Sequence, residues 1–174
     1  LIMKENLRDC LNMKSQLQLR YLVQQALIAS LYVAMLFVFQ WASFGVVQFR
    51  IAEVLLLLLF FNKHHWVGII IGTLIGNLLM SPIALDWIIG TGASLITVFL
   101  MIKTKEELLS LLWPAIINGL IVGWQLTYLY QLPTPFIMNV GSVFLGEFVV
   151  TFGFGMILLP YIRRNKALIK ILSK

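Results

Sequence analysis

The sequence predicts an all-α integral membrane protein, a bundle of six transmembrane helices with both termini in the cytoplasm. Three observations predict this fold class. Hydrophobic residues make up 60% of the 174 residues and charged residues only 11%, whereas soluble domains carry about 25% charged residues. The apolar residues fall into six runs near the length that crosses a bilayer, which is about 20 residues with a range of roughly 17–25. The basic residues lie almost wholly on one side when these runs are threaded through a membrane.

The six predicted spans, in chain order, are residues 22–40, 46–61, 66–80, 83–102, 108–130 and 136–162. The first meets the required length directly, and the last is unusually long. The second is less regular, because its purely apolar part, residues 54–61, is too short to cross a bilayer. That helix either includes Arg50 and Glu53 in its outer portion or begins part-way into the membrane. Short polar or proline-containing turns connect the runs, as is usual in helical bundles.

These runs divide the chain into three parts. Residues 1–20 form a polar N-terminal tail, residues 21–162 the six-helix membrane domain, and residues 163–174 a basic C-terminal tail. Met13-Lys14 resembles a natural start, so we interpret the residues before Met13 as an extension of the tail. Both tails are predicted to be cytoplasmic.

All 13 Lys and Arg residues except Arg50 fall on one side of such a bundle. They lie in the two tails and in the second and fourth turns, at Lys4, Arg8, Lys14, Arg20, Lys63, Lys103, Lys105, Arg163, Arg164, Lys166, Lys170 and Lys174. Cytoplasmic segments are enriched in Lys and Arg, so we place this side in the cytoplasm and Arg50 outside or near the outer interface. The net charge of +6 therefore indicates topology and contact with the anionic lipid bilayer rather than nucleic-acid binding.

Small residues recur every four positions in two of the runs. One stripe lies in the first run and one in the third, formed by Ala26, Ser30 and Ala34 and by Gly68, Gly72 and Gly76. Such stripes allow helices to approach closely in lipid. We interpret the glycine series as internal packing of the bundle, with a docking face for another membrane protein as the alternative.

Polar residues inside the runs indicate a binding site. A charge at the centre of a membrane helix costs about 2.5–3.5 kcal/mol on insertion scales, so it needs a partner or a purpose. Glu147 lies about 11 residues into the sixth run, or roughly 16 Å from its outer end. No basic residue is predicted at a similar depth, so Glu147 is either protonated or faces a wet cavity and binds something. The other candidate binding residues, at outer and middle depths, are Arg50, Glu53, Asn77, Asp86, Trp87, Asn118, Gln125, Tyr128 and Asn139.

Several of these residues also have a simpler structural interpretation. Arg50 and Glu53, at i and i+3, can form an ion pair at the interface. Asn77 and Asn118 can each make an interhelical hydrogen bond worth about 0.6 kcal/mol. Asp86 can be a helix N-terminal charge favoured by the dipole. Because the inner ends of the runs carry little comparable chemistry, the whole set predicts a pocket between the later helices that captures a solute from outside.

Enzymatic and metal-binding functions have little support in the sequence. His64 and His65 are adjacent rather than four residues apart, which makes a poor metal site on a helix. The lone Cys10 excludes an intrachain disulfide and a cysteine-based metal cluster. No Ser/His/Asp or Cys/His grouping and no glycine-rich phosphate loop after a strand is present. We therefore predict no enzymatic activity, no metal and no cofactor; if ATP drives transport, the ATPase is another chain.

Four segments, in order along the chain, resemble the QueT family, the substrate-binding S components of energy-coupling factor (ECF) transporters assigned to queuosine precursors. The most specific is the run from Ser43 to Glu53, SFGVVQFRIAE. The others are the run from Gly72 to Pro82 with Asp86 downstream, the run from Asn118 to Gly123, and Gly146-Glu147. The resemblance covers nearly all of the chain after the N-terminal tail.

The resemblance implies a six-helix S-component bundle in the plasma membrane of a bacterium, with an outward-facing pocket. It implies docking through Ala26, Ser30 and Ala34 onto a membrane coupling subunit similar to EcfT, which two cytoplasmic ATPase subunits drive. A 7-deazaguanine base presents adjacent N–H donors that a carboxylate accepts as a pair. We expect Glu147 on that edge, with Asn118 and Gln125 reading the remaining groups. Asp86 or Glu53 would pair with a cationic aminomethyl substituent, and Trp87 or Tyr128 would stack on the ring.

Two alternatives stay open. The chain could be an S component for another flat vitamin, such as riboflavin or thiamine. It could also be a non-transport membrane assembly protein whose polar residues only join helices, which predicts no saturable binding of a small molecule.

Overall fold

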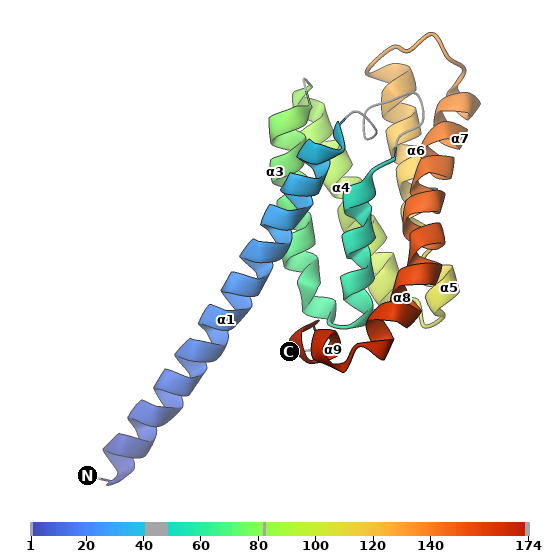
Figure 1. The fold of residues 1–174 in the computed structure, drawn as a ribbon. Helices are drawn as coiled ribbons and strands as arrows, with labels where there is room; N and C mark the ends of the chain where they lie inside the picture. Colours follow the sequence, from blue (N-terminus) through green and yellow to red (C-terminus); the bar gives the residue numbers. More distant parts are fainter. Residues whose placement is uncertain (1, 41–48, 82, 173–174) are drawn as a thin grey trace.

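The computed structural model describes residues 2–40, 49–81 and 83–172, with side chains from residue 15 onward. All regular structure in these ranges is helical, as predicted (Figure 1). The elements in chain order are α1 (Ile2–Val38), the 3-10 helices η1 (Ile51–Phe60) and η2 (Lys63–His65), α3 (Trp66–Met80), α4 (Ala84–Lys103), α5 (Glu107–Ser110), α6 (Trp113–Tyr128), α7 (Phe136–Glu147), the π-helical η3 (Phe148–Gly153), α8 (Phe154–Arg164) and α9 (Lys166–Leu172).

Among the described residues, four helical stretches are long and apolar enough to cross a membrane, so the chain is a membrane protein. They are Ser15–Val38, Ala84–Lys103, Glu107–Tyr128 and Phe136–Arg164. The second and third predicted spans are shorter: η1 has 10 residues and α3 has 15. The 3-10 form lengthens η1 to about 20 Å, against about 15 Å for the same residues in an α-helix, because its rise is about 2.0 Å per residue. Six full spans and the cytoplasmic location of the termini stay predictions.

Residues 2–20, predicted as a polar tail, continue helix α1 without a break. No glycine or proline occurs before Gly45, and Leu, Lys, Gln and Arg are good helix formers. The N-terminal part of α1 projects away from the bundle, so a straight helix replaces the expected tail (Figure 1). At the other end of the chain, α8 runs to Arg164 and the short helix α9 folds beneath the bundle.

The two ends of the bundle differ in the way that the charge asymmetry predicts. Both termini lie at the same end as the turns that carry Lys63, Lys103 and Lys105 (Figure 1). Contacts join these segments: the His65 side chain hydrogen-bonds the Leu172 carbonyl at 3.0 Å, and Arg163 forms a salt bridge with Glu107. We call this end, with η2, α5 and α9, the basic end. The opposite end carries Arg50, Ser81 and the α6–α7 connection.

The glycine series of α3 packs against α1, so its interpretation as internal packing is confirmed. A Cβ on Gly72 would lie 2.7 Å from Tyr32 Cβ, and one on Gly76 would lie 2.3 Å from Leu36 Cδ1. Only glycine allows the two helices to approach so closely. The hydrophobic core continues from this contact through η1, whose leucines are buried on nearly all sides. A helix that is apolar all round is expected at the centre of a bundle.

Candidate functional site

Arg50 and Glu53, at the start of η1, are buried within the bundle. Arg50 is 8% exposed and Glu53 is 1% exposed. Their side chains form the predicted i, i+3 pair, with 4.0 Å between Arg50 Nε and Glu53 Oε1. The same carboxylate oxygen accepts a hydrogen bond from the Tyr32 hydroxyl at 2.8 Å. Glu53 Oε2 is buried and has no hydrogen-bond partner among the described residues.

Asn77 connects this pair to the next two helices. Its Oδ1 accepts a hydrogen bond from Arg50 Nη2 at 3.3 Å, and its Nδ2 donates to Thr91 Oγ1 at 3.4 Å. The interhelical hydrogen bond predicted for Asn77 is therefore confirmed, between α3 and α4. Gly90 makes room for the amide, since a Cβ there would lie 2.9 Å from Asn77 Nδ2.

Glu147 and Asn118 meet at mid-depth between α7 and α6. Both side chains are fully buried, and Asn118 Nδ2 donates to Glu147 Oε1 at 3.2 Å. This contact confirms the similar depth that the sequence predicts for the two residues. The remaining polar atoms, Asn118 Oδ1 and Glu147 Oε2, are buried and unpartnered within the described residues. A buried polar atom left unpaired costs about 1–3 kcal/mol, so both atoms are suited to receive a ligand.

The sequence predicts no basic residue at the depth of Glu147, and the structure adds the electrostatic influence of one basic residue, Arg50, on its carboxyl group. Arg50 interacts electrostatically with Glu147, and also with Glu53 and Asp86. The sequence argument counted depth along uniform α-helices, whereas η1 begins only at Ile51 and has a longer rise per residue. In the described interior, one guanidinium is thus under the electrostatic influence of three carboxyl groups, of which Glu53 is in contact with it.

Asp86 forms a separate cluster at the end opposite the basic end. It lies in the first turn of α4, in agreement with the helix N-terminal role considered for it. Gln125 Nε2 donates to Asp86 Oδ1 at 2.6 Å, and the hydroxyls of Ser81 and Tyr130 both donate to Oδ2. Burial, followed by the hydrogen bond to Asp86, raises the pKa of Tyr130 to about 12, which keeps its hydroxyl a donor. The polar atoms of Asp86 and Gln125 are therefore engaged with each other, and the cluster joins α4, α6 and the α6–α7 connection.

The other predicted site residues are less centrally placed. Tyr128 is 58% exposed and packs against Trp124 and Phe136, with ring centroids 5.7 and 6.3 Å apart. The Asn139 amide donates to Thr127 Oγ1 at 2.9 Å and so links α6 with α7. Trp87, half-buried on α4, has an indole Nε1 that is buried and finds no partner in the part of the chain that the structure describes.

The structure adds polar residues on α4 that the sequence reasoning missed. Ser94 and Thr97 are at most 1% exposed, and neither hydroxyl has a partner in the described chain. Because α4 and α6 run antiparallel and Gln125 meets Asp86, Ser94 lies at the level of residues 117–118, next to the Asn118–Glu147 pair in depth. The helical spacing of Trp87, Thr91 and Ser94 places them on one face of α4. That spacing does not include Thr97, and no feature of the sequence marks either hydroxyl as unpaired, because a serine or threonine in an apolar helix usually bonds the carbonyl four residues earlier.

The backbone next to Glu147 departs from α-helical geometry. Glu147 is the last residue of α7, and the six residues that follow form the π-helical turn η3. The Thr151 hydroxyl lies within hydrogen-bond distance of two acceptors, the Glu147 carbonyl at 2.8 Å and the Leu111 carbonyl at 3.2 Å. Short π-helical turns inside α-helices occur frequently at functional sites, so this turn supports the same location for the site.

Two further predictions concern the outer surface of α1 and metal binding. Ala26, Ser30 and Ala34 are exposed along the outer face of α1, and the Ser30 hydroxyl donates to the Ala26 carbonyl at 2.8 Å. Among the described residues, no group of three His, Cys, Asp or Glu side chains could hold a metal ion. Residues 43–48 of the motif that most resembles the QueT family lie outside the described residues.

The comparisons with known proteins agree with the resemblance. The family model described as QueT transporter matches residues 22–164. The chain is 30% identical over 148 residues to a protein of Lactococcus lactis subsp. cremoris (strain MG1363) named queuosine precursor transporter QueT, covering 75% of this chain and 85% of the relative. No solved structure matches. As predicted, these matches are to transporters rather than to enzymes. The chain belongs to the QueT transporter family.

Proposed function

We propose that this chain is the substrate-binding subunit of an ECF-type importer that captures a queuosine precursor from outside the cell. The observation that carries the proposal is the mid-depth pair of Glu147 and Asn118, where a carboxylate oxygen and an amide oxygen are fully buried and have no partner among the described residues. Two free acceptors at one depth match a ligand that presents adjacent N–H donors. The related Lactococcus protein is named for a queuosine precursor, and a 7-deazaguanine base has such an edge.

In this proposal Glu147 accepts the paired N–H donors, because charge-assisted bidentate contacts are strong and geometrically selective. Asn118 Oδ1 accepts a further donor from the same ring. Ser94, whose hydroxyl is unpartnered at the same level, takes the third polar contact. It replaces Gln125, whose amide is already bonded to Asp86.

The charges near the pair favour a cationic form of the ligand. Three carboxyl groups, Glu53, Asp86 and Glu147, interact with the one guanidinium of Arg50 in the described interior. Buried charges are tolerated when they are paired, and an aminomethyl substituent supplies the missing positive charge. Glu53, with its free Oε2, is the better partner for it, since Asp86 already accepts three hydrogen bonds.

An aromatic side chain is expected to stack on the flat ring. Trp87 is the better candidate, because it is half-buried on the same face of α4 as Ser94, whereas Tyr128 is exposed. Trp87 can also donate its free indole N–H to a ring acceptor.

Coupling to ATP hydrolysis is proposed to occur through other chains. Ala26, Ser30 and Ala34 present a small-residue face outward from α1, and Ser30 returns its hydroxyl to the helix backbone. A smooth face of this kind permits close helix packing in lipid, which suits a membrane coupling subunit driven by two cytoplasmic ATPase subunits. The proposed location is the plasma membrane of a bacterium.

The test is calorimetric titration of the detergent-purified chain with aminomethyl-deazaguanine and with queuine, using riboflavin and thiamine as controls. The proposal predicts saturable binding of a deazaguanine and none of the two vitamins. Binding of a vitamin instead would identify an S component of another specificity. A folded protein that binds none of the four would favour the assembly role and overturn the proposed capture function.

A further inference from the structure

Arg50 and Glu53 lie close together without closing into a hydrogen-bonded ion pair. In a 3-10 helix the side chains at i and i+3 eclipse each other, and the Glu53 backbone N–H donates to the Arg50 carbonyl at 2.8 Å. A guanidinium and a carboxylate in such a position can form two parallel hydrogen bonds of about 2.7–2.9 Å. Here 4.0 Å separates Arg50 Nε from Glu53 Oε1, which is too long for a hydrogen bond. We call this arrangement of the two residues the open pair.

The helices α1 and α3 each hold one member of the open pair. From α1, the Tyr32 hydroxyl donates to Glu53 Oε1 at 2.8 Å. From α3, Asn77 Oδ1 accepts from Arg50 Nη2 at 3.3 Å. Tyr32 is itself fixed, because its side chain is fully buried in the core and Gly72 of α3 leaves room only for its close approach. Each charged side chain is therefore bonded to a partner other than the opposite charge.

The open pair leaves one carboxylate oxygen for a ligand. Glu53 is 1% exposed, and its Oε2 has no hydrogen-bond partner among the described residues. A buried carboxylate with a free oxygen is costly, and a cation that donates hydrogen bonds is the ligand that best offsets this cost. Glu53 interacts electrostatically with Glu147, so the free oxygen lies in the same part of the interior as the carboxylate proposed to bind the ring.

We propose that Tyr32 is a positioning residue that makes the site selective for a cationic ligand. By holding Glu53 Oε1, its hydroxyl keeps the carboxylate from turning both oxygens toward Arg50, and so reserves Oε2 for the ammonium group of the ligand. Without this hydroxyl, the guanidinium of Arg50 competes with the ammonium group for Glu53. The role of Tyr32 rests on the proposed function, because it concerns the same capture site.

The test compares two deazaguanines that differ in charge, by calorimetric titration of the detergent-purified chain at neutral pH. Aminomethyl-deazaguanine carries a cation, and cyano-deazaguanine has the same ring with a neutral substituent. A hydrogen bond to a charged group corresponds to about 10- to 150-fold in an equilibrium constant, so the original chain should prefer the aminomethyl compound by at least about 10-fold. In Tyr32→Phe the Kd for the aminomethyl compound should rise about 10-fold, while the Kd for the cyano compound should stay within about twofold.

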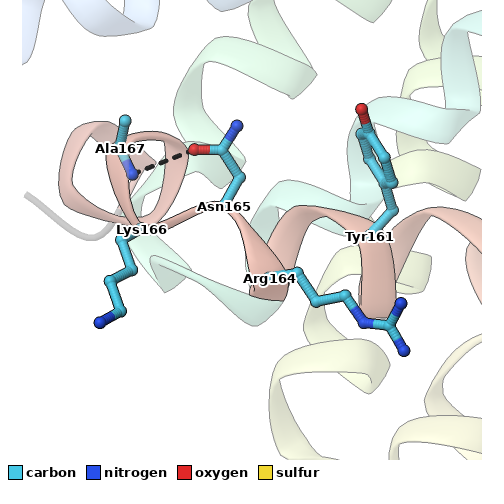
Figure 2. A pocket seen from close by; sticks show the side chains of 5 residues that line it. All are labelled: Tyr161, Arg164, Asn165, Lys166 and Ala167. Carbon is cyan, nitrogen blue, oxygen red and sulfur yellow. Dashed lines mark hydrogen bonds between the residues drawn. The ribbon is translucent and has the colours of Figure 1, made fainter.

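A second variant and a matched control complete the design. Asn77→Ala releases Arg50 toward Glu53 from the other side, so it should produce the same selective loss of affinity for the aminomethyl compound. Tyr161→Phe removes the same oxygen from a side chain that is 69% exposed at the bend between α8 and α9 (Figure 2). This control should leave both Kd values within about twofold, as expected of a surface substitution.

The ratio of the two Kd values separates positioning from a merely structural role. If Tyr32→Phe raises both Kd values by the same factor, or leaves the Kd for the aminomethyl compound unchanged, the positioning role is overturned. An original chain that binds both compounds equally well would overturn it too. Binding of neither compound by the folded original chain would refute the proposed function and the role of Tyr32 with it. Thermal unfolding checks that the variants fold, and if Tyr32→Phe does not, the Kd ratio in Asn77→Ala decides.

Discussion

Replacing Glu147 with Gln tests the candidate site with the smallest change in shape. Glu147 Oε1 already accepts from Asn118 Nδ2 at 3.2 Å, and Oε2 is free. A carboxamide has one acceptor oxygen in place of two, so only one of two ligand N–H donors keeps its partner. A hydrogen bond to a charged group contributes about 1.5–3 kcal/mol, which corresponds to a rise in Kd of about 10- to 150-fold.

Folding should not suffer from this substitution. A neutral amide is less costly to bury than a carboxylate, and Glu147 is fully buried. The thermal midpoint of the Glu147→Gln variant in detergent should therefore be unchanged or higher than that of the original chain. A loss of affinity without a loss of stability separates a binding role from a structural one.

The assay is calorimetric titration with aminomethyl-deazaguanine, combined with thermal unfolding of the same samples. Glu107→Gln is the matched control, because it makes the same chemical change in an exposed salt bridge at the basic end and should leave Kd within about twofold, as expected of surface pairs. An affinity for Glu147→Gln within that same range would remove Glu147 from the site. A variant that fails to fold would refute the argument that the carboxylate is retained for binding.

Four other predictions concern stability and binding. Asp86→Asn leaves part of a three-donor cluster without its acceptor and should lower the free energy of unfolding by about 1–3 kcal/mol, measured by chemical denaturation. The pKa of Tyr130 is raised to about 12 in the folded chain, against about 10 in the unfolded chain, so the unfolded state loses this proton first as the pH rises. Thermal stability should therefore fall between pH 10 and 12, and the fall should be smaller in the Tyr130→Phe variant. Gly72→Ala places a Cβ 2.7 Å from Tyr32 Cβ and should lower the free energy of unfolding by about 1–3 kcal/mol. The control Gly92→Ala, with open space around its Cβ, should leave the free energy of unfolding unchanged or raise it. Ser94→Ala removes an unpartnered buried hydroxyl, so thermal stability should rise while Kd for the deazaguanine increases about 2- to 10-fold; unchanged affinity would exclude Ser94 from the site.

The sequence predicted the polar groups well because burial in an apolar run is itself informative. A carboxylate or amide inside a membrane helix is costly, so Glu147, Asn118 and Asn77 could be selected from composition alone. The similar depth of Glu147 and Asn118 also followed from counting residues along the runs. The structure agrees, since Asn118 meets Glu147 and Asn77 joins two helices.

Estimating depth by counting residues along a span failed where the backbone is not α-helical. The position of Arg50 depends on η1, a 3-10 helix that begins at Ile51, and a count at 1.5 Å per residue cannot anticipate it. The direction of a side chain around its helix is equally hidden when the runs are apolar on all sides. For this reason the electrostatic influence of Arg50 on Glu147 could not be predicted. The hydrogen bond from Tyr130, a residue beyond the end of α6, to Asp86 could not be predicted either.

The hydroxyl groups show why part of the site is invisible in any single sequence. A serine or threonine in an apolar helix usually bonds the carbonyl four residues earlier, as Ser30, Thr73 and Thr104 do here. Such a residue carries no signal, because its own helix satisfies it. Ser94 and Thr97 depart from this rule, since neither hydroxyl has a partner among the described residues, and only the three-dimensional structure reveals this. Their free hydroxyls lie in the same interior as the free oxygens of Glu53, Asn118 and Glu147.

A membrane bundle that keeps several unpaired acceptors and hydroxyls buried gives up stability at each of them, about 1–3 kcal/mol per group. A purely structural bundle has no reason to retain them, since apolar residues of similar volume would pack there without the cost. A binding protein has such a reason, because a ligand that satisfies these groups recovers the lost free energy as affinity and rejects ligands that cannot. The opposing changes predicted for Ser94→Ala and Glu147→Gln, stability retained or raised while affinity falls, follow directly from this difference.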